Sequence, residues 1–205
     1  MKCGSDLIKK VFFYLLFLFI NINNILYAAC TEGVLINPNN ISSGGINPFF
    51  VVYSPIMSSG QLFAGVSNLG NVGGSNNGNI TLYDVSTTNG NFTNSASNIS
   101  SGTNPISMSY SPLDPYNNAY AAIANYSDST VYVYTMDSSG TYSSNHLTLN
   151  LANNLSSVAF SPFISNKVFL AVTEYSSAQI LIYSLIFLLL IKSKNIYKKE
   201  LYVTS

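Results

Sequence analysis

The chain of 205 residues contains no arginine and no tryptophan, and only 8% of its residues are charged. Between Cys30 and Leu185 a single base, Lys167, is accompanied by six acids. A nucleic-acid-binding surface needs clustered lysine or arginine side chains that displace counterions from the phosphates. We therefore predict that neither DNA nor RNA is a partner of this protein.

Histidine and cysteine are nearly absent as well. The one histidine, His146, lies in a segment predicted to be an outer strand, where we expect it to face solvent. Of the two cysteines, Cys3 would be lost with a predicted leader, which leaves Cys30 without an internal disulfide partner. One histidine and one cysteine are too few for a zinc site with three or four protein ligands.

No arrangement of residues in the sequence points to catalysis. No serine stands in a Gly-x-Ser-x-Gly turn, so a hydrolase triad has no support. Four acids fall in or beside predicted turns without the Asp-x-Asp spacing of a calcium loop, and we expect them to cap turns: Asp84, Asp114, Asp128 and Asp137. We predict no catalytic residue, no metal site and no cofactor.

What the chain does contain is a repeat unit of three segments that occurs three times. Each copy begins with an apolar run that ends in aromatic-Ser-Pro: Tyr53-Ser54-Pro55, Tyr110-Ser111-Pro112 and Phe160-Ser161-Pro162. A run of small and apolar residues follows, and then a run that alternates around a tyrosine. Those tyrosines, Tyr83, Tyr134 and Tyr183, are 51 and 49 residues apart.

A period of about 50 residues with several short strands in each unit is typical of propeller blades. We predict an all-β fold, a partial β-propeller of about three four-stranded blades at residues 46–100, 101–151 and 152–185. A lead-in at residues 30–45 precedes them. In the turn Asp137-Ser138-Ser139-Gly140 we expect the glycine to adopt a positive φ and the aspartate to cap the backbone.

The first 29 residues are predicted to be a signal peptide, with early lysines, the apolar run 11–20 and small residues at Ala28 and Ala29. We therefore expect export to the periplasm, the cell surface or the medium. Cys30 directly after these small residues suggests, as an alternative, the lipid-attachment site of a bacterial lipoprotein. Tyr27 stands where such sites carry leucine, so this alternative departs from the usual pattern.

The C-terminal end admits three interpretations. Residues 180–191 are largely apolar and a basic tail follows, so that residues 186–205 form an apolar and basic segment outside the predicted blades. The run could be a short membrane anchor, although it is shorter than the roughly 20 residues that a spanning helix needs. It could instead be a propeller strand followed by an apolar extension. The third interpretation, which we favour, is the disrupted end of a longer propeller.

The repeated units resemble those of the YVTN-type and WD-repeat-like propellers of secreted and surface proteins of microbes. The similar elements are Asn47-Pro48 and Asn104-Pro105 before the first strands, the aromatic-Ser-Pro ends, Ala122-Ile123-Ala124-Asn125 and Val131-Tyr132-Val133-Tyr134. The resemblance covers residues 46–185 and implies the fold; it does not imply one function. The Gly-His and Trp-Asp signature of eukaryotic WD repeats is missing.

We expect an exported, non-catalytic propeller module, a fragment of a longer propeller, that presents loops to an unknown protein or glycan partner. One alternative is the remnant of a propeller enzyme of the lactonase type; none of the charged site residues of such enzymes can be placed in this chain. The other is a structural surface protein held at a membrane through Cys30 or residues 180–191. With fewer than the four to eight blades that typically close a ring, self-association through open sheet edges is a further expectation.

Overall fold

The computed structural model describes residues 40–71, 78–93, 97–164, 167–187 and 201–204. The predicted signal peptide and Cys30 lie outside these residues. The chain divides into two compact units, Met1–Asn40 and Ile41–Ser205, and every described strand belongs to the second. No helix among the described residues has the length and apolar character needed to cross a membrane.

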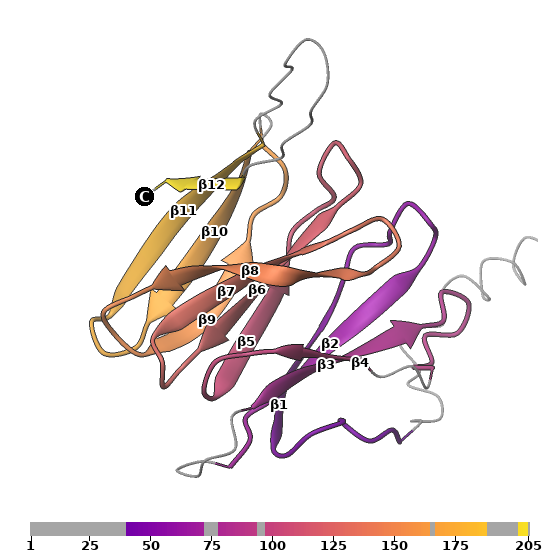
Figure 1. The fold of residues 1–205 in the computed structure, drawn as a ribbon, viewed down its shortest axis with the longest axis horizontal. Helices are drawn as coiled ribbons and strands as arrows, with labels where there is room; N and C mark the ends of the chain where they lie inside the picture. Colours follow the sequence, from indigo (N-terminus) through magenta and orange to yellow (C-terminus); the bar gives the residue numbers. More distant parts are fainter. Residues whose placement is uncertain (1–39, 72–77, 94–96, 165–166, 188–200, 205) are drawn as a thin grey trace, which may run out of the picture. The chain divides into compact units, whose positions relative to one another are not determined.

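The described strands form three antiparallel sheets of four strands each, and each sheet is one blade (Figure 1). Blade one consists of β1 (Pro48–Tyr53), β2 (Leu62–Asn68), β3 (Asn79–Val85) and β4 (Ser97–Ser100). Blade two consists of β5 (Pro105–Tyr110), β6 (Ala119–Asn125), β7 (Thr130–Met136) and β8 (Tyr142–Asn150). Blade three consists of β9 (Leu155–Phe160), β10 (Lys167–Glu174), β11 (Gln179–Phe187) and β12 (Leu201–Thr204). The all-β partial propeller predicted from the sequence is confirmed.

The middle strands of blade two, β6 and β7, form from small, β-branched and aromatic residues. Every residue of β6 is buried, because this strand is covered on both faces by neighbouring blades. Its partner β7 alternates valine and tyrosine, and in the register of the pair Ala122 lies opposite Val133 and Ala121 opposite Tyr134. Since successive side chains of a strand point to opposite faces, the valines and the tyrosines pack against different neighbours.

The blades pack face to face through two apolar clusters. The first lies between blades one and two and includes Phe63, Leu82, Met108 and Tyr134. The second lies between blades two and three and includes Tyr120, Val133, Val158 and Leu170. The inner strands β1, β5 and β9 lie side by side, as expected for consecutive blades around one axis.

The aromatic-Ser-Pro motif has the same structural role in each blade. In each blade the hydroxyl oxygen of this serine accepts a backbone N–H from near the start of the next strand. The donors are Phe63 for Ser54, Tyr120 for Ser111 and Phe169 for Ser161. Each hydroxyl also donates to the carbonyl of the following proline. The serine therefore joins the end of the inner strand to the strand beside it, and the proline, which has no N–H, ends the inner strand without an unpaired donor.

The fourth strand of blade three lies within residues 186–205, the segment that we treated as a tail. β12 pairs antiparallel with the end of β11, with Leu185 opposite Val203 and Phe187 opposite Leu201. The sequence Leu201-Tyr202-Val203-Thr204 is rich in β-branched and aromatic residues, which favour strands. The structure of blade three thus continues past residue 185, although the repeat unit in the sequence ends there.

Candidate functional site

A pocket of about 480 Å³ opens where the inner strands of the three blades begin. Its lining comes from the starts of β1, β5 and β9 and from the loops that follow β2 and β6. The lining residues are Phe49, Leu69, Asn104, Ile106, Tyr126, Ser127, Leu155 and Ser156. All three blades contribute to it, so the packing of the blades creates this pocket.

An asparagine before each inner strand holds the neighbouring loop in place. The backbone carbonyls of Asn47, Asn104 and Asn154 accept the N–H groups of Leu69, Tyr126 and Tyr175 respectively. Asn47 and Asn104 both have φ near +56°, a left-handed conformation that asparagine tolerates better than most residues. Each asparagine thereby fixes the position of the residue that directly follows the second strand of the same blade.

The side chain of Asn104 links the loops of two blades across the pocket wall. Its Nδ2 donates to the carbonyl of Leu69 in blade one at 3.0 Å. Its Oδ1 accepts the hydroxyl of Ser127 in blade two at 2.6 Å. Because both ends of the amide are engaged, the side chain is held in one orientation, and it stiffens the wall between the two blades.

The surface of the pocket is mostly apolar, with a few polar groups. Phe49, Leu69, Ile106 and Leu155 supply apolar area, while the amide of Asn104 and the hydroxyls of Ser127 and Ser156 supply hydrogen-bonding groups. Tyr126 combines both characters in one exposed ring. Such a surface can hold a ligand by ring stacking and a small number of hydrogen bonds.

Two of the acids that we expected to cap turns do so, Asp114 and Asp137, whereas Asp128 bonds to a residue of another loop. Asp114 Oδ1 accepts the N–H groups of Tyr116 and Asn118 in the loop between β5 and β6. Asp128 accepts the N–H of Thr103, and Asp137 accepts the N–H groups of Ser139 and Thr141. The backbone carbonyl of Asp84 accepts the N–H of Thr93.

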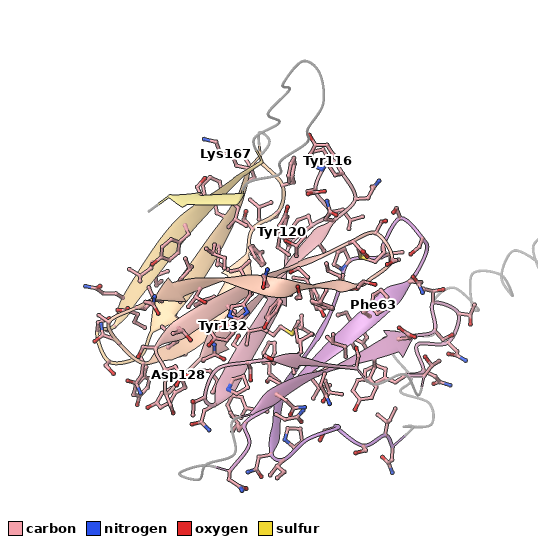
Figure 2. All side chains as sticks on the ribbon, viewed as in Figure 1. Phe63, Tyr116, Tyr120, Asp128, Tyr132 and Lys167 are labelled. Carbon is pink, nitrogen blue, oxygen red and sulfur yellow. The ribbon has the colours of Figure 1, made fainter. Side chains whose placement is uncertain are left out.

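Asp114 lies at the end of blade two opposite to Asp128. The Asp114 loop carries Tyr116 and the Asp128 loop carries Tyr126, and Figure 2 shows Tyr116 and Asp128 at opposite ends of the blade. Tyr120 donates its hydroxyl to Asp114 Oδ2 at 3.0 Å, and burial first, with the neighbouring carboxylate second, raises its pKa. These groups stabilise the loop and are remote from the pocket.

His146 lies in β8, the outer strand of blade two, as predicted, but it does not simply face solvent. Its ring stacks on Tyr132 with centroids 4.0 Å apart, and it also lies near Tyr134. It is half-buried, and burial lowers its pKa. Among the described residues no three His, Cys, Asp or Glu side chains gather where they could hold a metal ion.

One buried acid was not singled out from the sequence. Glu174, at the end of β10, accepts the hydroxyl of Ser177 at 2.6 Å and the amide of Asn153 at 2.8 Å. The hydrogen bonds of Ser177 and Asn153 hold the pKa of this carboxyl below its ordinary value. In the register of the blades Glu174 takes the place of Asn125, whose Oδ1 accepts the N–H of Gly102.

The pocket itself was also missed in the sequence. The Asn-Pro pairs before β1 and β5 were noted as part of a family resemblance, and they carried the relevant signal. An asparagine that precedes a proline at the start of a repeated inner strand marks a loop at the same end of every blade. What the sequence could not indicate is which residues of three separate loops meet there.

Comparison with known proteins identifies one family. The family model described as "Lactonase, 7-bladed beta-propeller" matches residues 24–159, which include blades one and two and most of β9. A search of the curated proteins found no match. The match supports the β-propeller superfamily that the repeats indicated, and the resemblance to YVTN-type and WD-repeat-like propellers stays a prediction.

Proposed function

The chain belongs to the family of seven-bladed β-propeller lactonases, and on that premise we propose that it is an exported, non-catalytic propeller module that binds a protein or a glycan. The observation that carries the proposal is the pocket at the start of the inner strands. Its volume of about 480 Å³ lies in the range usual for sites that bind small molecules or the end of a larger ligand.

The residues of the pocket suit contact with a sugar ring or an aromatic side chain. Tyr126 offers a flat ring with a hydroxyl, and Phe49 offers a second exposed ring from blade one. The fixed amide of Asn104 keeps the loops of Leu69 and Ser127 together, so the rings are presented on a wall that is already formed. Preformed walls reduce the entropy lost on binding.

The direct test is binding of the purified chain to immobilised glycans and to peptides, compared with the variant Tyr126→Ala. We expect the substitution to weaken binding at least tenfold, because a ring that is removed from the pocket takes its stacking area with it. Tyr116→Ala is the matched control, since Tyr116 is an exposed tyrosine at the opposite end of blade two. Equal binding of both variants and of the unmodified chain would contradict the proposal.

Export is a separate part of the proposal. The lysines, apolar run and small residues of the first 29 positions support it. Expression of the full chain in a bacterial host should give a product that begins near Cys30, either released or retained by a lipid on that cysteine. N-terminal sequencing and labelling with a radioactive fatty acid distinguish these two results, and a cytoplasmic product that still begins at Met1 would contradict export.

The family match favours one second candidate, hydrolysis of a lactone. In this reaction water adds to the ring ester, the ester C–O bond breaks and a hydroxy acid forms, which releases a proton at neutral pH. Titration at constant pH with a panel of simple lactones measures it directly. Turnover above the background of the heat-unfolded chain would favour this candidate over the binding module.

A further inference from the structure

The polar side chains of the pocket wall already have partners within the protein. Asn104 uses its Nδ2 for the carbonyl of Leu69 and its Oδ1 for the hydroxyl of Ser127. The hydroxyl of Ser156 lies 2.7 Å from the hydroxyl of Thr173 in the neighbouring strand β10. These three lining side chains therefore leave few hydrogen-bonding groups for a ligand.

The remainder of the wall is apolar, and none of the lining residues that the structure describes is charged. A sugar ring carries several hydroxyl groups, and each hydroxyl that is buried without a partner weakens binding. A charged group would lose its hydration in the pocket without gaining a counter-charge from the wall. The wall therefore favours an apolar group of the ligand over a sugar ring or an ion.

Two exposed rings line the pocket from different blades. Phe49 of blade one is 61% exposed and Tyr126 of blade two is 37% exposed, so both offer ring surface to a ligand. The N–H of Tyr126 donates to the carbonyl of Asn104 at 3.0 Å, which holds this ring on a loop that is formed before a ligand arrives. Aromatic pairs gain energy from stacked and edge-to-face contacts in addition to the area that they bury. An aromatic group is therefore the apolar group that suits the pocket best.

A carboxylate lies beside the pocket. Asp128 directly follows the lining residue Ser127, and it accepts the backbone N–H of Thr103, the residue before Asn104. Asp128 is exposed, whereas the one base among the described residues, Lys167, lies at the opposite end of the strands (Figure 2). The rim of the pocket is therefore negative, and it favours a positive charge next to the aromatic group of the ligand.

On the basis of the proposed binding function, we infer that the pocket receives an aromatic side chain of a protein partner, with a lysine or arginine next to it in the partner's chain. The aromatic group contacts the rings of Phe49 and Tyr126, and the basic group lies at the carboxylate of Asp128. The partner's backbone meets the polar rim, where water can bridge the groups that do not bond directly. A neutral glycan, the other ligand class of the proposed function, offers neither the aromatic nor the basic group.

The test uses a short acetylated peptide with one tryptophan between two lysines. The protein contains no tryptophan, so the fluorescence anisotropy of the peptide reports its binding to the purified full chain directly. We expect saturable binding that Phe49→Gln weakens about tenfold, because the substitution removes one of the two rings. Ile56→Gln is the matched control and should leave binding unchanged, since Ile56 is 60% exposed and lies beyond the other end of β1. Circular dichroism checks that each variant folds.

A second peptide, with glutamates in place of the two lysines, tests the charge at the rim. We expect this peptide to bind about threefold more weakly, as is usual for an exposed charge pair. Asp128→Asn should remove the difference between the two peptides, because asparagine keeps an acceptor for the N–H of Thr103 and loses the charge. Equal binding of both peptides to the unmodified chain would overturn the preference for a basic partner.

A panel of immobilised glycans separates failure of this inference from failure of the proposed function. Binding of a glycan without binding of the tryptophan peptide would overturn the inference and leave a binding module standing. Binding of neither would overturn both. Peptide binding that survives Phe49→Gln would also overturn the inference, since the peptide would then occupy a different site.

Discussion

The ring of Phe63 in blade one lies directly against the backbone of Gly140 in blade two. A Cβ atom on Gly140 would stand 2.0 Å from Cζ of Phe63, and Gly140 has φ of +85° in the turn between β7 and β8. The sequence predicted the positive φ of this glycine. The contact with Phe63 adds a second requirement for glycine, because the turn of one blade closes over the apolar cluster shared with another.

Gly140→Ala should therefore destabilise the protein more than a glycine substitution at a similar turn. The left-handed backbone costs alanine roughly 1–2 kcal/mol, and the displaced ring of Phe63 adds about 1–3 kcal/mol of overpacking. Gly60→Ala is the control, since Gly60 has φ of +81° with nothing within 4 Å of its added Cβ. Chemical denaturation measures the loss of unfolding free energy in both variants. Equal losses would mean that the Phe63 ring moves aside without a cost in stability.

Ser54→Ala should show that the serine of the repeated motif stabilises the blade. The buried N–H of Phe63 donates to Ser54 Oγ at 3.0 Å, and a buried donor without its acceptor costs about 1–3 kcal/mol. Ser161→Ala in blade three removes the same bond at a more exposed place, where water can replace the hydroxyl. We expect a smaller loss of unfolding free energy there; the reverse order would contradict a role for burial.

Ala122→Leu should destabilise the chain because this methyl group lies between blades two and three with no exposed surface. Inserting a larger side chain into such a contact costs about 1–3 kcal/mol. Ala171 occupies the equivalent position in blade three, on the face that carries the exposed Ile180 and Ile182, and is partly exposed. Ala171→Leu should leave the melting temperature nearly unchanged, as thermal unfolding of the two variants can establish, and equal losses would contradict the argument from burial.

The hydrogen bonds of Glu174 predict that the protein loses stability at acidic pH. Hydrogen bonds from Ser177 and then Asn153 lower the pKa of its carboxyl in the folded chain below the ordinary value of 4.5. A group whose folded pKa is depressed stabilises the fold above its unfolded pKa, and this contribution disappears as the pH falls through the folded value. Ser177→Ala should thus lower the melting temperature at pH 7 and have little effect at pH 2, and an equal effect at both would contradict the linkage.

The sequence predicted the strands better than the site, for reasons that particular residues make plain. Val131-Tyr132-Val133-Tyr134 alternates because its two faces meet different blades, and that local pattern is readable without a structure. Phe49 and Tyr126 lie far apart in the chain and have no pattern in common, yet both line the pocket. His146 was expected to face solvent because nothing near it in sequence indicated that Tyr132 lies beneath its ring.

By itself the sequence determined the all-β fold, the order of strands in blades one and two and the positive φ of Gly140, since these depend on neighbouring residues and on a period that repeats. Only the tertiary structure decided which loops enclose the pocket, where Glu174 finds its hydrogen bonds and which apolar faces remain uncovered. Those features arise from contacts between blades about 50 residues apart, and the alternation of a single strand states that a face is apolar without stating what covers it.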